Sequence, residues 1–363
     1  MKIMKNRVFL DVHAIQTLPP SNINRDDTGS PKTAQYGGVR RSRVSSQSWK
    51  KAMRDYFKEY GNVSNVGVRT LNIVNYIAQK IQEIDPKISY EPAIIMADDI
   101  LNKANIKTKD LKAKALFFLG DIQAQRLAEA AISQETDKKN LQAILRDNPA
   151  IDIALFGRMV ADDPSLNEDA SCQVAHAIST HAVDTEFDFF TAIDDLSPED
   201  NAGAGMLGTI EFNSSTLYRY ANIALHELTH QINNKEATIN TVNLFLDAFV
   251  KSLPTGKVTT FANQTLPQAL LVQIRSDRPI NLVTAFEKPI CSSKGYVDES
   301  IDKLFKESLN VSKIADEPIS TYYLVLNDAD YSDFGGQDSR NLDELKHLLT
   351  DKLKEILPEM SES

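Results

Sequence analysis

The sequence predicts an α+β fold: a ferredoxin-like core of strands and helices that carries a large helical insertion. Runs rich in β-branched and aromatic residues at 7–18, 269–275 and 320–327 are typical of strands. Residues 70–148, in contrast, are polar, with a helical pattern and few strand signals. The outer parts of the chain follow the order strand, helix, strand-rich, helix, strand, strand, helix, which is compatible with a split β-α-β core.

The first strand is followed by a connection at 19–44 that is rich in Pro, Gly, Asp and Ser. A loop of this length is usually functional or disordered. The run Ser45-Ser46-Gln47-Ser48 offers an N-cap, so a helix should begin there and continue to about Tyr60. One face of this helix is apolar and consists of Trp49, Ala52, Met53, Tyr56, Phe57 and Tyr60.

The insertion should contain helices at 70–85, 91–104, 108–133 and 137–147. After about residue 150, aromatic residues, Thr and Gly become more frequent. Within this part, the segment SPEDNAGAGMLG at 197–208 is predicted to be a hairpin tip or a mobile loop. Two further helices are expected at 235–253, which Pro254 ends, and at 341–356.

The composition is that of an ordinary globular protein, with 363 residues, 42% hydrophobic and 25% charged. Cys172 and Cys291 are far apart and form no metal or disulfide pattern, which suits a reducing cytosol. The apolar run near the start is interrupted by Asp11 and His13, so we expect no signal peptide there. No apolar run is long enough to span a membrane, and we expect a cytoplasmic protein with no membrane partner.

The charge is unevenly distributed along the chain. The net charge of −10 argues at first against a nucleic-acid partner. Residues 28–54, however, contain seven basic residues and no acidic one, whereas the rest has 33 basic and 50 acidic residues. A basic patch on an acidic body fits local phosphate binding, and a solvated basic face is the alternative. The seven are Lys32, Arg40, Arg41, Arg43, Lys50, Lys51 and Arg54.

The run HELTH at 226–230 matches the H-E-x-x-H pattern of zinc peptidases. On a helix, His226 and His230 share one face and could bind zinc, with Glu227 as general base. The extended pattern would need glycine at position 233 and histidine at position 236, where the chain has asparagine and glutamate. A more distant third ligand such as Glu287 stays open. A zinc-dependent hydrolase is therefore the alternative function, and a short polar helix with solvated histidines is the simpler interpretation.

Two other groups of residues suggest metal chemistry only weakly. His176 and His181 lie near Cys172 but on different helix faces and without a fourth ligand. The pairs Asp26-Asp27 and Asp194-Asp195 fall in turn-rich segments, where such pairs usually cap local structure. Neither a P-loop nor a strand followed by G-x-G-x-x-G occurs. We therefore expect no metal and no cofactor.

The segment YGGVRRSRVSSQSWKKAMR at 36–54 concentrates groups that bind phosphate. Gly37-Gly38 should free the backbone for close approach to a ligand. Three arginines follow within four residues, and serines then stand at a helix start, where N–H groups and the helix dipole favour an anion. Two lysines and an arginine continue along the first turns. This set suits a chain of phosphates better than a single phosphate.

These residues resemble the start of the CasC-type backbone subunit of the type I-E CRISPR Cascade complex. The resemblance begins at Asn24-Arg25-Asp26-Asp27 and continues through the segment at 36–54. Further matches follow in the same order: DIALFGRM at 152–159, AHAISTHAVD at 175–184, DFFTAIDDL at 188–196, GTIEF at 208–212, YRYANI at 218–223 and AFEK at 285–288.

The resemblance implies a non-catalytic RNA-binding subunit shaped like a hand, with an RRM-like palm, helical fingers and a β-hairpin thumb. Several copies would polymerise along one CRISPR RNA, alongside other Cascade subunits, and present guide segments for pairing with target DNA. A monomeric RNA-binding module is a further alternative. The implied division is palm at 1–65, fingers at 66–150, thumb and connecting web at 151–225, and the second part of the palm at 226–363.

The resemblance also implies which residues contact RNA. The palm would grip phosphates, Met159 would wedge against a displaced nucleotide, the thumb would contribute Phe189, Phe190 and Thr191, and Lys288 would add a phosphate contact. The simpler interpretations are that the two phenylalanines belong to the core and that Met159 fills a gap. The predicted RNA-binding residues are Arg25, Lys32, Arg40, Arg41, Arg43, Ser45, Gln47, Lys50, Lys51, Arg54, Met159, Phe189, Phe190, Thr191 and Lys288.

Overall fold

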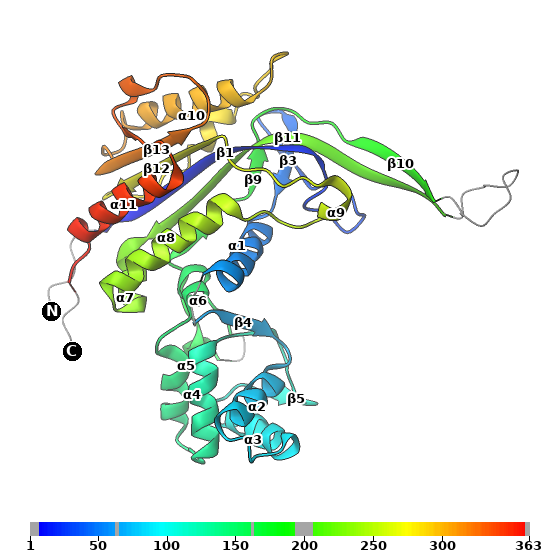
Figure 1. Ribbon diagram of the computed structural model, residues 1–363, viewed down its shortest axis with the longest axis vertical. Coiled ribbons are helices and arrows are strands. Elements are labelled where there is room, and N and C mark those ends of the chain that lie inside the picture. Colours follow the sequence, from blue (N-terminus) through cyan, green and yellow to red (C-terminus); the bar gives the residue numbers. More distant parts are fainter. Residues whose placement is uncertain (1–6, 62–64, 161–162, 193–205, 360–363) are drawn as a thin grey trace, which may run out of the picture. The chain divides into compact units, whose positions relative to one another are not determined.

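The computed structural model describes residues 7–61, 65–160, 163–192 and 206–359 and contains both helices and one large sheet (Figure 1). The predicted mixture of helices and strands is thus confirmed. The strands of the large sheet are β1 Phe9–Ser21, β2 Thr33–Tyr36, β3 Val39–Val44, β8 Cys172–Val174, β9 Ala177–Ser179, β10 Glu186–Ala192, β11 Met206–Ala224, β12 Ala269–Arg275, β13 Ser320–Val325 and β14 Gln337–Asp338.

The sheet runs in the order β14-β13-β12-β1-β11-β9-β3-β2, and β8 and β10 also pair with β11. β12 is antiparallel to both β1 and β13, and β9 is antiparallel to both β11 and β3. Every residue of β12 is buried, as expected for a central strand that is covered on both faces. The strands predicted at 7–18, 269–275 and 320–327 correspond to β1, β12 and β13.

The longer helices lie largely where the apolar periodicity predicts them. The prediction missed α10, although Ile301, Leu304 and Phe305 follow helical spacing on its buried face. The helices are α1 Ser46–Tyr60, α2 Ile73–Ile84, α3 Tyr90–Lys103, α4 Asp121–Ile132, α5 Lys138–Arg146, α6 Ile151–Phe156, α7 Leu225–Ile232, α8 Lys235–Lys251, α9 Val258–Phe261, α10 Val297–Val311 and α11 Leu342–Ile356, with short 3₁₀ turns η1 Pro164–Leu166, η3 Leu282–Phe286 and η4 Ser332–Phe334.

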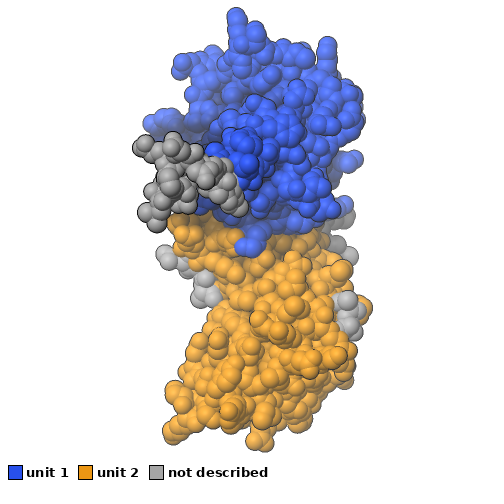
Figure 2. Space-filling view, turned by 90° about the vertical axis from the view of Figure 1, so that its right-hand side faces the viewer, with its two compact units in different colours: residues 1–53, 174–222, 246–352 blue, residues 54–173, 223–245, 353–363 orange. Residues whose placement is uncertain are grey.

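The chain divides into two compact units (Figure 2). The first comprises 1–53, 174–222 and 246–352, and the second comprises 54–173, 223–245 and 353–363. The residues predicted as fingers lie within the second unit, and the four-part division into palm, fingers, thumb and second palm segment stays a prediction. Among the described residues, no helix is both long and apolar enough to cross a membrane.

The first unit is built on the large sheet. Helix α10 covers one face of β1 and β12, while the parts of α1, α8 and α11 that belong to this unit lie toward the other face (Figure 1). Between α10 and the sheet, Leu304 and Phe305 pack with Ile15, Leu271 and Tyr323. The Phe305 ring meets Tyr323 edge-on, with ring centroids 5.4 Å apart. The same core includes Leu282 and Phe286 of η3, the turn that precedes Lys288.

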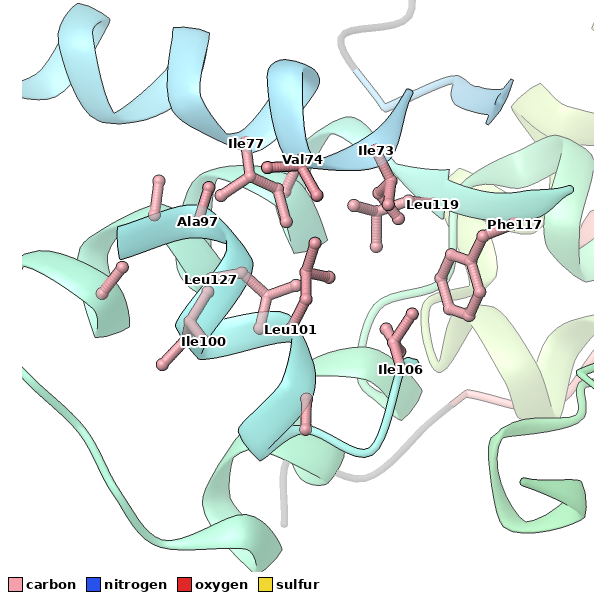
Figure 3. Close-up of a cluster of buried hydrophobic side chains, with 14 of the residues drawn as sticks. Ile73, Val74, Ile77, Ala97, Ile100, Leu101, Ile106, Phe117, Leu119 and Leu127 are labelled. Atoms are coloured by element: carbon pink, nitrogen blue, oxygen red, sulfur yellow. The ribbon is translucent and has the colours of Figure 1, made fainter. Parts of the chain in front are cut away.

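The second unit has its own core, in which α2, α3 and α4 pack together with β7 Phe117–Gly120, and β7 pairs with β4 Gly67–Thr70. Figure 3 shows side chains of α2, α3, α4 and β7 gathered in this core, among them Ile77, Leu101, Leu119 and Leu127. The predicted helix at 108–133 is wrong in its first half. That half forms β5 Thr108–Lys109, β6 Lys112–Ala113 and β7, because β7 finds a distant partner in β4.

A β-hairpin extends from the large sheet (Figure 1). Its two arms are β10 and the first part of β11, paired from Glu186↔Phe212 to Ala192↔Met206. The hairpin agrees with the thumb hairpin implied by the family resemblance. Most of the segment predicted as its tip, residues 197–205, lies outside the described residues, as does the Asp194-Asp195 pair.

Candidate nucleic-acid interface

The β2–β3 hairpin and the start of α1 carry most of the predicted palm residues. Arg40 is exposed on β3, where it pairs in register with Gln35 of β2. Lys32 and Arg43 are half-buried, and the Arg43 N–H donates to the carbonyl of Lys32 at 2.9 Å. No acidic residue stands in the first turn of α1. Positive side chains and a helix N-terminus are therefore brought together, as the sequence predicts.

Ser45 caps α1 and does not project freely. It is buried, its Oγ accepts from the N–H of Ser48 at 3.3 Å, and its own N–H donates to Asn24 Oδ1 at 2.8 Å. This confirms the predicted N-cap. The contact that the family resemblance implies between Ser45 and RNA stays a prediction.

His176 is a neighbour of this surface that the sequence considers only as a metal ligand. Its Nδ1 lies 3.2 Å from Nη1 of Arg43 and 3.4 Å from the N–H of Ser46. Burial, Arg43 and Lys32 together lower the pKa of His176. With Nδ1 accepting from these donors, Nε2 carries the hydrogen of the neutral ring and can donate to an anion. The pairing of β3 with β9 places His176 here, and only the sheet order reveals that pairing.

Helix α1 is held by a buried arginine under its first turn. The guanidinium carbon of Arg219 lies 3.7 Å from the ring centroid of Trp49, and Arg219 Nη2 donates to the carbonyl of Phe249 at 2.6 Å. Burial lowers the pKa of Arg219 to about 9. The stack fixes the buried face of the helix, so Gln47 and Lys51 are exposed and Lys50 is half-buried on the other faces.

Arg41 does not face solvent, in contrast to Arg40 beside it. Its side chain is fully buried, and its guanidinium donates to main-chain carbonyls. The described position therefore does not offer Arg41 to a phosphate. Gly37 also differs from expectation: its backbone approaches protein, since a Cβ there would lie 1.7 Å from the Glu287 carbonyl oxygen. An added Cβ at Gly38 would meet nothing within 4 Å. Gly38 therefore leaves room for the close approach of a ligand that the sequence predicts for both glycines.

Arg54 is likewise committed to the protein. Its Nε donates to Oδ2 of Asp152 at 3.1 Å, and its guanidinium carbon lies 4.3 Å from the ring centroid of Phe118. Asp152 is fully buried, and its Oδ1 accepts from the N–H of Gly67 at 2.8 Å. The apolar periodicity of α1 does not reveal this pair, because the partner is almost a hundred residues away in the sequence.

The remaining predicted palm cations are exposed. Lys288 follows η3 and is exposed, as is Arg25, which forms an antiparallel bridge with Pro31. Each lies in a connection between regular elements of the first unit. Exposure is what a phosphate contact needs, and the two assignments stay predictions.

Met159, in the second unit, is 82% exposed, and the residues before it are tied to the protein. Gly157 before it has a φ of +78°, a backbone conformation that favours glycine. The buried Arg158 donates to the carbonyls of Leu166 and Leu145 at 3.0 and 2.7 Å. Met159 is thus not a core gap-filler, and its neighbours hold it outward.

The hairpin presents its aromatic residues on opposite faces. Phe187 and Phe189 share one face with Leu207, and each of the three is about two-thirds exposed. Phe190 lies on the other face opposite Gly208, where a Cβ would lie 2.3 Å from its ring. Thr191 is exposed. The alternative that Phe189 belongs to the core is wrong, while Phe190 is partly covered by its own hairpin.

The HELTH run lies on α7, a short helix ended by Asn233 with a φ of +53°. Leu225, Leu228 and Thr229 bury one face, and His230 is exposed. Within the described ranges, no group of three or more His, Cys, Asp or Glu residues is arranged to hold a metal ion. His181 uses both ring nitrogens, Nδ1 toward the Ala182 carbonyl and Nε2 toward the Thr216 N–H. The geometry does not support the hydrolase alternative.

Residues 10–350 match the family described as CT1975-like protein. The chain belongs to this family. A chain of a "CRISPR RNA-guided surveillance complex, pre-nicking" is 31% identical to this CT1975-like protein, with a TM-score of 0.83, and the match covers 95% of this chain and 100% of that one.

A chain of another "CRISPR RNA-guided surveillance complex" is 28% identical, with a TM-score of 0.74 and a match that covers 95% of this chain and 99% of that one. Among curated proteins, none matches this CT1975-like protein. The resemblance to a CRISPR surveillance-complex subunit is confirmed at this level. The narrower assignment to type I-E stays a prediction.

Proposed function

We propose that this CT1975-like protein is a non-catalytic, CRISPR-RNA-binding subunit of an RNA-guided surveillance complex. The observation that carries the proposal is the match over nearly the full length of both chains to a chain of such a complex. The exposed cations Arg40, Lys51 and Lys288 support it from the residues themselves. They belong to a chain that is otherwise acidic, so binding to RNA would be local.

More narrowly, the protein would be the backbone subunit of a type I-E Cascade complex. The sheet order β12-β1-β11-β9 supports an RRM-like palm, because the first strand lies between two strands that come later in the chain. Helices α1 and α8 would be the two helices of that core. The helical part of the second unit would form the fingers, and the β10–β11 hairpin the thumb.

Phosphate contacts position a protein on a nucleic acid without reading its sequence. Guanidinium and ammonium groups on β3, α1 and at Lys288 would therefore hold any guide equally well. Sequence choice would be left to base pairing between the guide and target DNA, as in RNA-guided recognition generally. Copies repeated along one guide would then present it in segments.

Met159 and Phe189 supply the side chains that could press against a displaced base. Both are exposed by more than half. A flexible thioether and an aromatic ring can each rest on the face of any base, so neither would impose a sequence preference. This assignment gives the thumb and the loop at Met159 a role that phosphate contacts cannot fill.

The deciding experiment is to purify the protein after co-expression with a CRISPR array, extract the bound nucleic acid and sequence it. Guides derived from the array would support the proposal, and random RNA or no RNA would contradict it. The mass of the RNA-bound protein, measured by light scattering, separates a multi-copy backbone from a monomeric RNA-binding module. Discrete multiples of the chain on one guide are expected.

A further inference from the structure

Arg41 is a buried cation whose partners are main-chain carbonyls. Its Nε donates to the Tyr36 carbonyl at 3.1 Å and its Nη1 to the Ser179 carbonyl at 2.9 Å. Its Nη2 donates to the carbonyls of Phe286 and Glu287 at 2.8 and 3.2 Å. One planar guanidinium thus connects the end of β2, the end of β9 and the end of η3. Such a fork of donors is specific to arginine.

A second contact joins the hairpin turn and the end of η3 through the main chain. Gly37, in the turn between β2 and β3, has a φ of +59° and packs directly on the main chain of Glu287. An added Cβ would lie 1.7 Å from the Glu287 oxygen and 2.8 Å from its carbonyl carbon. Beside it, the Tyr36 hydroxyl donates to the Val283 carbonyl at 3.3 Å. The hairpin turn and the end of η3 are therefore in close main-chain contact.

Two of the connected segments carry an exposed cation next to the contact. Arg40 immediately precedes Arg41, and its carbonyl accepts from the N–H of Val183 at 3.0 Å. Lys288 immediately follows Glu287 and is exposed. The two cations come from parts of the chain almost 250 residues apart, so their relative position depends on this contact.

We propose that Arg41 is a positioning residue, which holds Lys288 and Arg40 in one arrangement for binding successive RNA phosphates without touching RNA itself. The inference rests on the proposed function, because it takes Lys288 as a phosphate contact. Lysine cannot replace Arg41, since an ammonium has three donors on a flexible stem and cannot span carbonyls on three segments.

The test measures binding of a fluorescein-labelled single-stranded RNA of mixed sequence as a function of salt concentration. Each phosphate contact to single-stranded nucleic acid contributes about 0.7 to the log–log salt slope, or about five-fold in affinity at 0.1 M salt. Lys288→Ala should therefore reduce the slope by about 0.7. Arg41→Lys should cause a similar loss, although it preserves the charge. The matched control Arg340→Lys should bind as wild type, because Arg340 is 87% exposed, pairs with Glu344 and is not among the predicted RNA contacts.

The double variant Arg41→Lys/Lys288→Ala decides between positioning and direct contact. If Arg41 acts through Lys288, the double variant binds no more weakly than Arg41→Lys alone, because the lysine contact is already lost. Additive losses in affinity, or an Arg41→Lys variant with the wild-type slope, would overturn the inference. If Arg41→Lys only destabilised the protein in general, its loss in affinity would add to that of Lys288→Ala.

Gly37→Ala provides a second route that keeps the arginine at position 41, although the new Cβ would also lie 3.2 Å from Arg41 Nη2. Displacement of the turn from Glu287 should reproduce the slope of Lys288→Ala and show the same lack of additivity with it. A folded Gly37→Ala variant with wild-type binding would overturn the inference even if Arg41→Lys does not fold. A Lys288→Ala variant with an unchanged salt slope would also overturn the inference. Wild-type protein that binds RNA without any salt dependence would contradict the proposed function itself.

Discussion

Replacement of Arg54 by alanine separates two roles for a basic residue of α1. As a phosphate contact, Arg54 would contribute to RNA affinity and little to stability. In the structure its Nε is 3.1 Å from Oδ2 of Asp152, whose side chain is fully buried, while the Arg54 side chain is 11% exposed. Removal of one partner from such a pair leaves an uncompensated buried charge and typically costs about 3–5 kcal/mol of unfolding free energy.

The expected loss depends on pH. Burial raises the pKa of Asp152, and Arg54 opposes that rise. Without Arg54 the carboxyl pKa rises further, so the folded state favours the protonated form over a wider range. A carboxyl group whose pKa is higher in the folded state than in the unfolded state stabilises the fold at low pH. This stabilisation is lost as pH rises from the unfolded-state pKa of about 4 through the folded-state pKa. The deficit of Arg54→Ala should therefore be smallest near pH 4 and grow toward neutral pH.

The assay is urea unfolding followed by circular dichroism at several pH values, with Lys51→Ala as an exposed control expected to change stability by about 0.5 kcal/mol or less. The double variant Arg54→Met/Asp152→Asn should recover most of the loss, since no buried charge is left. RNA binding of Arg54→Ala, measured below its unfolding transition, should retain the wild-type salt slope. Unchanged stability together with a slope lower by about 0.7 would refute this reasoning and restore Arg54 to the RNA contacts.

Three other results are expected. Lys50→Ala combined with Lys51→Ala should lower the salt slope of RNA binding by about 1.4, equally for unrelated sequences, and an unchanged slope would count against the palm assignment. Phe189→Ala should weaken RNA binding while the thermal midpoint stays near wild type, because the ring is 66% exposed; a large drop in the midpoint would mean that it is core. Burial raises the pKa of Asp11 to about 7 and lowers the pKa of His13 to about 3. Between about pH 4 and 6.5, Asp11 is therefore protonated only in the folded chain, and His13 is protonated only in the unfolded chain. The two effects on the pH dependence of stability cancel in wild type. In Asp11→Asn only the effect of His13 remains, so the unfolding free energy should fall, relative to wild type, by about 1.4 kcal/mol for each pH unit of acidification. Parallel curves of unfolding free energy against pH for the two proteins would contradict this.

Local patterns in the sequence identify elements whose pattern persists over many residues. The apolar face of α1 and the runs that form β12 and β13 are examples. The helical pattern failed at 108–120, where FFLG becomes a strand only because it pairs with the distant β4. Short strands of this kind depend on a partner that no local window contains.

The seven basic residues at 28–54 illustrate what composition does not determine. Charge counting treats Arg40, Arg41 and Arg54 alike, but the first is exposed, the second is bound to main-chain carbonyls and the third is paired with Asp152. Alternation along β3 separates Arg40 from Arg41, and this alternation is visible in the sequence once the strand is recognised. The partners of Arg41 and Arg54 come from remote segments and require the fold.

Strand β11 continues without a break from the hairpin into the large sheet. Its first residues pair with β10, and Leu217 and Tyr218 farther along pair with β9. Because side chains alternate along a strand, insertion of a single residue between these two regions would exchange the sides of the arm on which Phe189 and Phe190 lie. Insertion or deletion of two residues on each strand between these regions would preserve those sides. Among related proteins, this part of the arm should therefore differ in length by an even number of residues on each strand.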